Sequence, residues 1–355
     1  MSAKESFVFV MNPYATLNLQ TETSLLLMQE LLDRGHPVFW LQEDELSLQH
    51  TRLIGNVHAV ESVSPFRLAP GKSIDLDTFD ALVQRKDPPF DTGYLQLTLL
   101  LDFLDSRVVQ FNEAHALRNF NEKLLPLRWP EFTPPTLVSS NSAVIETFVA
   151  AHGEAILKPL HDCSGRGIRK VTWDAQGSFR SVIAKALSTA DGLTRLLVVQ
   201  KFLPTVSKGD KRVFLVAGEP VGAVNRLPRS GTFLANIHQG AICEPATLTD
   251  RERHIIANIA PTLRREGIFL AGADFIDGFL TEINITSPSA ARQINAVSGL
   301  RLEQIIVDAM LQRLRENRSP RADSADWATV SGKSVNISSA DHEIWPAGVQ
   351  HEIGH

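Results

Sequence analysis

The stretch that decides the fold is Gly272-Ala273-Asp274-Phe275-Ile276-Asp277-Gly278-Phe279-Leu280-Thr281-Glu282-Ile283-Asn284. Two apolar-rich runs flank Asp277-Gly278, a dipeptide typical of β-hairpin turns. Strand side chains alternate between two faces, so a three-residue loop at 277–279 places Asp274 directly opposite Glu282, with Asn284 on the same face. A two-residue loop puts the two carboxylates on opposite faces, so a shared site at this hairpin depends on the longer loop.

Two carboxylates and an amide oxygen on one face are a ligand set that suits Mg²⁺, which prefers oxygen and usually shares its shell with nucleotide phosphates. The candidate metal ligands are therefore Asp274, Glu282 and Asn284. The alternative from these residues alone is an ordinary hairpin with a polar outer face.

The composition is that of an ordinary globular protein, and 355 residues are enough for two or three domains. A formal charge of −5 gives no basic surface for nucleic acid, so an anionic ligand needs a local cluster of Lys, Arg and backbone N–H groups. The 2 cysteines cannot form a disulfide framework or a Cys₄ zinc site. The sequence shows no signal peptide and no run apolar enough to span a bilayer, so we expect a cytoplasmic protein without a membrane partner.

Residues 1–120 alternate between strands and helices, which favours a parallel sheet wrapped by helices. The expected strands are 7–11, 38–41, 81–84 and 108–111, and the expected helices are 22–34, 94–104 and 114–125. The prolines at 126, 130, 134 and 135 then mark a linker.

Two further units follow the linker. The unit at 137–202 has expected strands at 155–160, 169–173 and 196–202 and helices at 142–152 and 181–187. The unit from 211 has a hairpin turning at 217–220, a helix at 250–266, the hairpin quoted above and a helix at 302–315. From about 317 the chain is rich in Ser, Ala, Asp and Pro, which predicts a disordered tail.

Several segments are candidates for binding anions, and each has an ordinary structural alternative. Lys158 ends a strand before the loop 161–168, whose backbone N–H groups can surround phosphates, but a plain turn is the alternative. Residues 200–203 precede Pro204, where irregular backbone can bind an adenine edge, but a simple strand end is the alternative.

Two arginine-containing segments are also candidates for binding anions. Arg85 and Lys86 follow a strand at the edge where open α/β sheets bind ligands, or else form a solvated charged loop. Arg212 and Arg226 flank one hairpin and can both reach a phosphate or carboxylate, or else are surface charges on an exposed strand pair.

The last five residues, His351-Glu352-Ile353-Gly354-His355, match a His-Glu-x-x-His zinc motif. The motif stops at its second histidine, Gly354 weakens a helix, and the preceding tail is expected to be unstructured. We therefore do not expect a zinc protease site there.

Individually these motifs are weak, but their order resembles that of the bacterial glutathione synthetase family of ATP-grasp ligases. The resemblance covers about residues 6–315. It rests on Met11-Asn12-Pro13, Arg85-Lys86-Asp87-Pro88-Pro89-Phe90-Asp91, Asn121-Glu122-Lys123-Leu124, Leu157-Lys158-Pro159-Leu160, Gly209-Asp210-Lys211-Arg212, Asn225-Arg226-Leu227-Pro228 and Thr281-Glu282-Ile283-Asn284.

The resemblance implies a mixed α/β and α+β fold. It consists of a pre-ATP-grasp α/β domain at 1–121, a central ATP-grasp lobe at 122–203, a C-terminal ATP-grasp lobe at 204–316, and a tail at 317–355. The resemblance also implies ATP as co-substrate, two Mg²⁺ ions with Mn²⁺ as a substitute, small acidic peptide and amino-acid substrates, and a homo-oligomer, either dimer or tetramer.

Roles follow from the resemblance residue by residue. ATP contacts are implied for Lys123, Lys158, Ser164, Gly165, Gly167, Gln200, Lys201, Phe202, Leu203 and Asp210. Arg212 and Arg226 are implied to be catalytic and to face the transferred phosphate. Substrate contacts are implied for Arg85, Lys86, Asn236, Ser287, Ser289 and Arg292.

The implied reaction joins γ-glutamylcysteine to glycine with ATP, through an acyl phosphate. Departures from the family pattern leave alternatives open. One is Leu234, which stands where the mobile loop of the family has an Arg two residues before its Asn. His161-Asp162-Cys163-Ser164 replaces part of a glycine-rich loop, and Ser289-Ala290-Ala291-Arg292-Gln293 replaces a run that contains Thr and Arg-Glu. One alternative is a related ligase with a different acid or amine, and the other is a nucleotide-binding protein without turnover.

Overall fold

The computed structural model describes residues 4–160, 166–189 and 193–318. Ser164 and Gly165 of the loop near Lys158, and the tail with its terminal His351-to-His355 motif, lie outside the described residues. Met1–Arg318 form one compact unit that contains three β-sheets. None of the described helices is long and apolar enough to cross a membrane.

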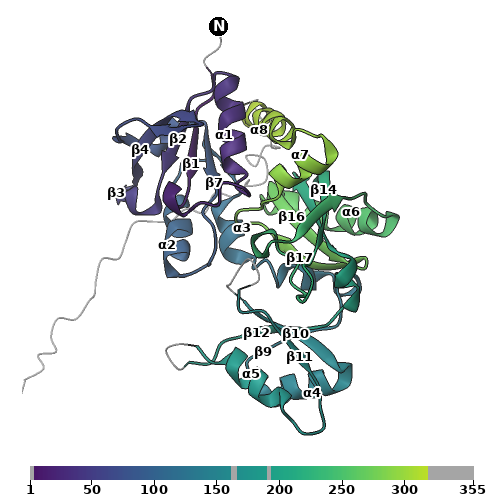
Figure 1. The fold of residues 1–355 in the computed structure, drawn as a ribbon. Helices are drawn as coiled ribbons and strands as arrows, with labels where there is room; N and C mark the ends of the chain where they lie inside the picture. Colours follow the sequence, from purple (N-terminus) through teal and green to yellow (C-terminus); the bar gives the residue numbers. More distant parts are fainter. Residues whose placement is uncertain (1–3, 161–165, 190–192, 319–355) are drawn as a thin grey trace, which may run out of the picture. The chain divides into compact units, whose positions relative to one another are not determined.

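The first sheet has a parallel core that confirms the predicted alternation of strands and helices (Figure 1). Its parallel strands are β1 (Phe7–Val10), β2 (Val38–Leu41), β7 (Ala81–Gln84) and β8 (Val109–Phe111), and its helices are α1 (Ser24–Asp33), α2 (Thr92–Leu101) and α3 (Ala114–Asn119). The sheet continues through antiparallel strands that the sequence did not predict: β3 (Leu46–Gln49), β4 (Arg52–Val63), β5 (Phe66–Leu68) and β6 (Lys72–Asp75).

The expected helix 114–125 is wrong in its extent, because α3 ends at Asn119. The segment that follows carries Glu122 and Lys123 and contains only the short 3₁₀ turn Leu125–Arg128. Phe120 leaves the helical conformation for an extended one, with φ −120° and ψ 117°, and this ends the helix. The irregular segment thereby brings Glu122 beside the third sheet, where the Ile283 N–H donates to its backbone carbonyl at 3.0 Å.

The second sheet is antiparallel and carries two helices on one face (Figure 1). Its strands are β9 (Thr136–Ser139), β10 (Glu154–Pro159), β11 (Arg169–Thr172) and β12 (Leu197–Lys201), and its helices are α4 (Ser142–His152) and α5 (Phe179–Leu187). The Asn141 side chain accepts hydrogen bonds from the first turn of α4, and Gly153 ends that helix with a φ of 74°. Ile145, Leu157 and Ile183 lie in the core between helices and sheet.

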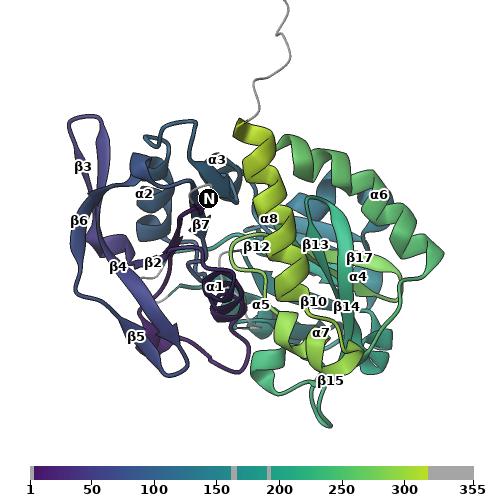
Figure 2. The ribbon, with the colours of Figure 1, turned by 90° about the horizontal axis from the view of Figure 1, so that it is seen from above.

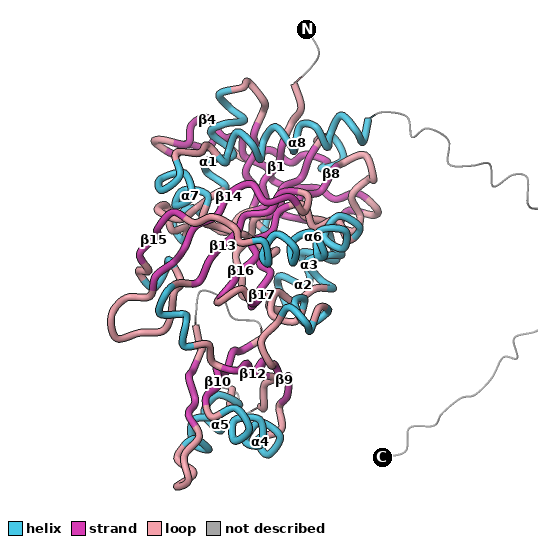
Figure 3. The backbone as a smooth tube through the Cα atoms, turned by 90° about the vertical axis from the view of Figure 1, so that its right-hand side faces the viewer, coloured by secondary structure: helices cyan, strands magenta, loops and turns pink. Residues whose placement is uncertain are grey.

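The third sheet is also antiparallel, with β14, β13 and β16 side by side at its centre (Figure 3). Its strands are β13 (Asp210–Val216), β14 (Glu219–Leu227), β15 (Ile242–Pro245), β16 (Leu270–Ile276) and β17 (Phe279–Asn284). Helix α6 (Asp250–Arg265) packs beside it and begins with a capping box between Thr249 and Glu252. Helices α7 (Ala291–Ser298) and α8 (Leu302–Arg318) follow, and the sequence did not predict α7.

The hairpin of β16 and β17 turns in two residues, so the predicted three-residue loop at 277–279 is wrong. Asp277 and Gly278 have φ values of 53° and 73°, which are typical of a tight hairpin turn. Phe275 pairs with Leu280, yet Asp274 still pairs with Glu282, because Thr281 is an extra residue in a β-bulge. The bulge therefore restores the register that the longer loop was expected to supply.

Buried Asn112 joins the first sheet to the third. Its side-chain amide donates to the carbonyls of Leu270 and Ile285 at 2.8 and 2.7 Å. Its side-chain oxygen accepts from the N–H groups of Phe269 and Leu270 at 2.7 and 2.6 Å. All four bonds end on backbone groups, three of them on the buried residues Leu270 and Ile285, so Asn112 fixes where β16 and β17 lie relative to β8.

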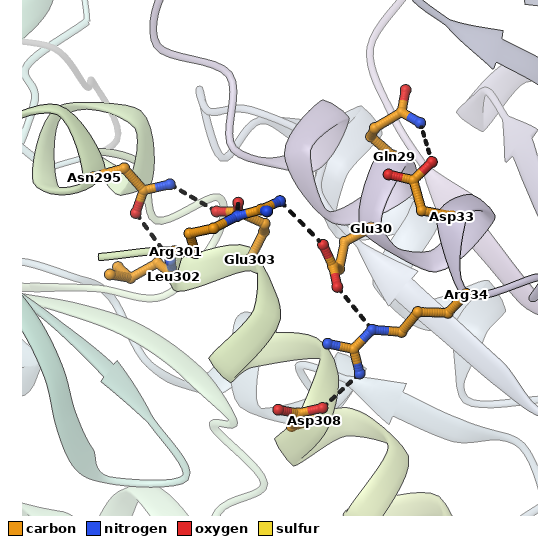
Figure 4. A network of polar contacts seen from close by, with 9 residues as sticks. All are labelled: Gln29, Glu30, Asp33, Arg34, Asn295, Arg301, Leu302, Glu303 and Asp308. Atoms are coloured by element: carbon orange, nitrogen blue, oxygen red, sulfur yellow. Dashed lines mark hydrogen bonds and ion pairs between the residues drawn. The ribbon is translucent and has the colours of Figure 1, made fainter. Parts of the chain in front are cut away.

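A polar network ties the C-terminal helices to α1 (Figure 4). Glu30 on α1 accepts from Arg34 at 2.8 Å and from Arg301, just before α8, at 3.5 Å. Arg301 also pairs with Glu303 at 2.9 Å, and Arg34 reaches Asp308 on α8 at 2.5 Å. Figure 2 shows α8 lying between α1 and β14, so these contacts hold the first and third sheets together along one side.

We predict that Asn112→Ala lowers the free energy of unfolding by about 4 kcal/mol, because it leaves several buried backbone groups unpaired at about 1–3 kcal/mol each. Urea unfolding followed by tryptophan fluorescence measures the loss. Exposed Asn119 offers a matched control, since Asn119→Ala should change stability by less than about 0.5 kcal/mol. Equal stability of the two variants would show that Asn112 does not carry the junction.

Candidate active site

A cavity of about 530 Å³ lies between the first and third sheets and is also lined by Arg166 and Ile168, just before β11 of the second sheet. Nine of the predicted site residues line it: Arg85, Lys123, Arg212, Arg226, Asn236, Glu282, Asn284, Ser287 and Ser289. Residues that follow β1 and β7 in the chain form one wall, and residues of β13, β14 and β17 form the other. The cavity therefore brings together residues that lie up to about two hundred positions apart in the chain.

Asp274 lies at the centre of a buried charge cluster beside this cavity. The Nε of Arg212 donates to Asp274 Oδ1 at 2.5 Å and its Nη2 donates to Oδ2 at 2.8 Å, a two-pronged pair. Arg226 Nη2 lies 3.0 Å from Asp274 Oδ1. Burial opposes ionisation of Asp274, but the two arginines outweigh it and hold the pKa of this carboxyl below its usual value.

Strand register explains why these side chains meet. Arg212 on β13 pairs with Asp274 on β16, and Asp210 on β13 pairs with Arg226 on β14. Gly272 leaves room for the Arg212 side chain, because a Cβ at that position would lie only 2.9 Å from Arg212 Cδ. The glycine therefore permits the close approach of a guanidinium to the strand.

Asp210 shares the cluster through Arg226, whose Nη2 lies 2.8 Å from Asp210 Oδ1. Burial raises the pKa of Asp210 and, together with Asp274 and against the opposing effect of Arg226 and Arg212, brings it to about 6. Burial alone would lower the pKa of Arg226, but the two carboxylates raise it. The cluster therefore contains one carboxylate that is strongly ionised and one that readily takes a proton.

The predicted phosphate-binding lysines lie close to the hairpin face. Lys123 Nζ is 3.6 Å from Glu282 Oε1, and Lys158 Nζ donates to Gln200 Oε1 at 3.0 Å. Burial lowers the pKa of Lys158, and the nearby Lys123 adds to that effect. Gln200 is itself held by Thr136, to which its amide donates at 3.0 Å.

Four other predicted ATP residues lie in or next to strands β11 and β12 of the second sheet. Lys201 is exposed, and the ring of Phe202 lies beneath the ammonium of Lys170 at 3.9 Å and edge-on to Phe233 at 6.1 Å. Leu203 follows in extended conformation, and Gly167 has a φ of 70°. These four residues do not line the cavity.

Two predicted substrate residues have other partners and do not line the cavity. Lys86 Nζ pairs with Glu43 at 2.7 Å, and Arg292 Nε donates to the Glu22 carbonyl at 2.9 Å. Arg85, by contrast, does line the cavity, and its guanidinium donates to Ser24 Oγ and to the Pro288 carbonyl.

Glu122 is a cavity residue to which the sequence analysis gave no role, although it lies in a quoted motif. It is half-buried and accepts from the Ile285 N–H at 2.7 Å and from the N–H and hydroxyl of Thr286 at 2.9 and 2.8 Å. Burial raises its pKa, and Glu282 raises it further. The position between Asn121 and Lys123 was the available signal, but only the fold shows that Glu122 reaches β17.

The oxygen donors on the hairpin are compatible with a divalent ion that shares its shell with a ligand. Glu282 and Asn284 line the cavity, and Asn284 Nδ2 donates to Asp274 Oδ2 at 3.1 Å. In the part of the chain that the structure describes, no three His, Cys, Asp or Glu side chains gather into a ready-made metal cluster. Both carboxylate oxygens of Asp274 are occupied in the structure, Oδ1 by Arg212 and Arg226 and Oδ2 by Arg212 and Asn284.

Comparison with solved structures identifies the class of fold. The chain resembles the D-cycloserine synthetase DcsG with a TM-score of 0.61 at 15% identity, over 87% of this chain and 99% of that one. It also resembles the ATP-grasp ligase PsnB with a TM-score of 0.58 at 15% identity, over 87% and 99% of the two chains. The fold is therefore that of ATP-grasp ligases.

Sequence comparison gives the family. The model of the prokaryotic glutathione synthetase ATP-grasp domain matches residues 122–299, and that of the N-terminal domain matches residues 6–118. A glutathione synthetase of Xanthomonas campestris is 35% identical, over 85% of this chain and 96% of its own. One of Synechococcus elongatus is 36% identical, over 85% and 97%. The chain belongs to the prokaryotic glutathione synthetase family.

Because of the charge cluster, we expect substitutions at two predicted metal ligands to differ in their effect on the free energy of unfolding. Asp274→Asn should lower the free energy of unfolding by about 3 kcal/mol, because it leaves two buried guanidinium groups without their shared carboxylate. Glu282→Gln should cost less than about 1 kcal/mol, because Glu282 is partly exposed and its contact with Lys123 is long. Thermal and urea unfolding of the unliganded proteins measure both values.

Turnover should fall below detection in both variants, since each removes one negative oxygen donor. An Asp274→Asn protein as stable as the wild type would contradict the description of the charge cluster. Near wild-type turnover in both variants would contradict the metal assignment.

Proposed function

We propose that this protein catalyses the ATP-dependent joining of γ-glutamylcysteine to glycine, which gives glutathione, ADP and phosphate. The observation that carries the proposal is the match to both domains of the prokaryotic glutathione synthetase family, with relatives about 35% identical over most of the chain. The cavity supports it, because cations for phosphates and oxygen donors for a divalent ion line one space.

ATP is proposed to lie between the second and third sheets. Lys123 and Lys158 are proposed to neutralise its phosphates, and backbone N–H groups of Ser164, Gly165 and Gly167, which follow Lys158 in the chain, are proposed to contact the phosphates as well. Residues 200–203 border the adenine, and Asp210 completes the nucleotide site.

Asp274, Glu282 and Asn284 are proposed to hold two Mg²⁺ ions together with the phosphates. Bound there, the ions supply positive charge against the triphosphate.

The chemistry requires a carboxylate of the acid substrate to attack the γ-phosphorus of ATP while ADP leaves. Arg212 and Arg226 are proposed to exchange their contacts with Asp274 for contacts with the transferred phosphoryl group. Two guanidinium groups that are already desolvated and positioned lose little energy in reorganisation when charge develops near them. The glycine amine then attacks the acyl carbon, and phosphate leaves as the amide bond forms.

The segment 229–240 is proposed to cover the acyl phosphate, which water would otherwise hydrolyse. Its ends are joined where Arg229 Nε donates to the Gly240 carbonyl at 2.6 Å. Within the segment, Asn236 lines the cavity. Ser287 and Ser289 also line the cavity, and we propose that they contact the substrates.

A second candidate function is ligation of a different acid or amine by the same chemistry. The run Ser289-Ala290-Ala291-Arg292-Gln293 favours it, because only Ser289 of this run lines the cavity and Arg292 is engaged by the Glu22 carbonyl. A protein that binds nucleotide without turnover is disfavoured, because the described residues include the complete set of cations and oxygen donors.

Phosphate release from Mg-ATP with γ-glutamylcysteine, measured with and without glycine, tests the proposal. We expect release that depends on glycine and a product with the mass of glutathione by mass spectrometry. Phosphate release only with another amine, such as alanine or serine, would favour the second candidate function. Nucleotide binding without phosphate release in a panel of acids and amines would contradict both.

A further inference from the structure

The turn that follows α3 is hydrogen-bonded to the strand end beside Lys158. In residues 121–123, the Asn121 amide donates to the Leu160 carbonyl at 3.0 Å, and the Asn121 side-chain oxygen accepts from the Lys123 N–H at 3.0 Å. Leu160 comes directly after β10, the strand that carries Lys158. One side chain therefore joins the backbone of one predicted phosphate-binding lysine to the strand end beside the other.

Glu122 contacts the third sheet from the same turn. Its Oε1 accepts from the N–H groups of Ile285 and Thr286 at 2.7 and 2.9 Å and from the Thr286 hydroxyl at 2.8 Å. Ser287 follows directly in the chain and lines the cavity. Glu122 thereby fixes the start of the segment that we propose to contact the substrates.

The turn is closed by its own backbone, so the two side chains keep a fixed relation to each other. The Asn121 carbonyl accepts from the N–H groups of Leu124 and Leu125 at 3.0 and 2.8 Å. Moving the end of β10 relative to residues 285–286 therefore requires opening this turn or breaking the bonds of Asn121 or Glu122, each of which is unfavourable. The reaction proposed for this protein gives neither side chain a role.

We propose that Asn121 and Glu122 are positioning residues that couple the binding of nucleotide to the binding of the acid substrate. The inference rests on the proposed function, which assigns Lys123 and Lys158 to the nucleotide phosphates and Ser287 to the substrates. Phosphates bound by both lysines fix the end of β10 against the turn, and Glu122 fixes residues 285–287 in turn. The acid therefore binds more tightly after the nucleotide, and by linkage the nucleotide binds more tightly after the acid.

Isothermal titration calorimetry on the full chain with Mg²⁺ measures this coupling. The probes are a non-hydrolysable ATP analogue and γ-glutamyl-2-aminobutyrate, an acid without an oxidisable thiol. The coupling factor is the ratio of the affinities for the acid with and without the analogue. We expect a factor of about 5 or more in the wild-type protein, as is typical of coupled sites.

Glu122→Ala removes the acceptor of three hydrogen bonds and leaves both lysines in place. It should lower the coupling factor to less than about 2, while the affinity for the analogue alone changes by less than about threefold. Glu122→Gln keeps an oxygen that can accept from the same donors, so it should restore part of the coupling. A residue needed only for stability would lower the unfolding temperature without changing the coupling factor of the folded protein.

Asn121→Ala breaks the contact with Leu160 and leaves the bonds of Glu122 in place. Because the two residues act in one chain of contacts, Asn121→Ala should lower the coupling factor as far as Glu122→Ala does, and the double variant should lower it no further. Glu113→Ala is the matched control, since Glu113 is a half-buried carboxylate just before α3 that does not line the cavity. It should keep the wild-type coupling factor.

Hydrogen–deuterium exchange followed by mass spectrometry gives a readout that needs no acid. The analogue should slow exchange in the peptide that contains the Ile285 and Thr286 N–H groups by about fivefold or more in the wild type, but not in Asn121→Ala. Equal slowing in these two proteins, or a wild-type coupling factor in Glu122→Ala, would overturn the proposal. A wild-type protein that shows neither coupling nor slowing would overturn it as well.

Binding of the acid and exchange of the backbone N–H groups separate this inference from the proposed function. Slowing that Asn121→Ala abolishes, in a protein that does not bind γ-glutamyl-2-aminobutyrate, would support the inference and reject the proposed acid. Formation of glutathione, together with a wild-type coupling factor in both Asn121→Ala and Glu122→Ala, would support the proposed reaction and reject the inference.

Discussion

The site depends on one buried carboxylate, Asp274, which two arginines share. Arg212 approaches from β13 and Arg226 from β14, so the contact joins three adjacent strands of the third sheet. Breaking such a buried pair from one side costs about 3–5 kcal/mol. In the unliganded protein the same contact keeps the two cations positioned and desolvated beside the cavity, and it occupies the carboxylate that a divalent ion would need.

The rest of the fold positions other polar side chains around Asp274 and the cavity. The bulge at Thr281 returns Glu282 to the face of Asp274, and Asn112 fixes the hairpin against the first sheet. The chain after α3 brings Glu122 and Lys123 to β17. The α1–α8 network supports the wall of the cavity that carries Glu22 and Arg85. A space lined with cations and oxygen donors is thereby assembled from segments remote in sequence.

Much of the fold could be predicted from the sequence, because local patterns determine it. The parallel strands and helix α4 follow from apolar periodicity and turn residues, whereas Asp274 pairs with Glu282 only because of a bulge. The bulge could not be predicted, since a two-residue turn and an extra strand residue give the same alternation as a three-residue loop. The strands of 46–75 were missed because they alternate only weakly and lie half exposed.

The roles of particular polar residues were harder to predict than the elements that carry them. Asn112 and Glu122 act on backbone groups about 160 residues away, and no local pattern shows such partners. The sequence placed Arg212, Arg226 and Asp274 in one site but treated the aspartate as an open metal ligand. Only the register of β13 against β14 and β16 shows that the arginines occupy it first.

The central claim is that Asp274 is available to a divalent ion only when nucleotide phosphates draw Arg212 and Arg226 away. Electron paramagnetic resonance of Mn²⁺, titrated into the protein with and without a non-hydrolysable ATP analogue, tests it most directly. The account predicts little protein-bound Mn²⁺ without nucleotide and a protein–nucleotide complex that binds Mn²⁺ more tightly than the nucleotide alone does. Tight binding of Mn²⁺ to the nucleotide-free protein, lost in Asp274→Asn, would contradict it.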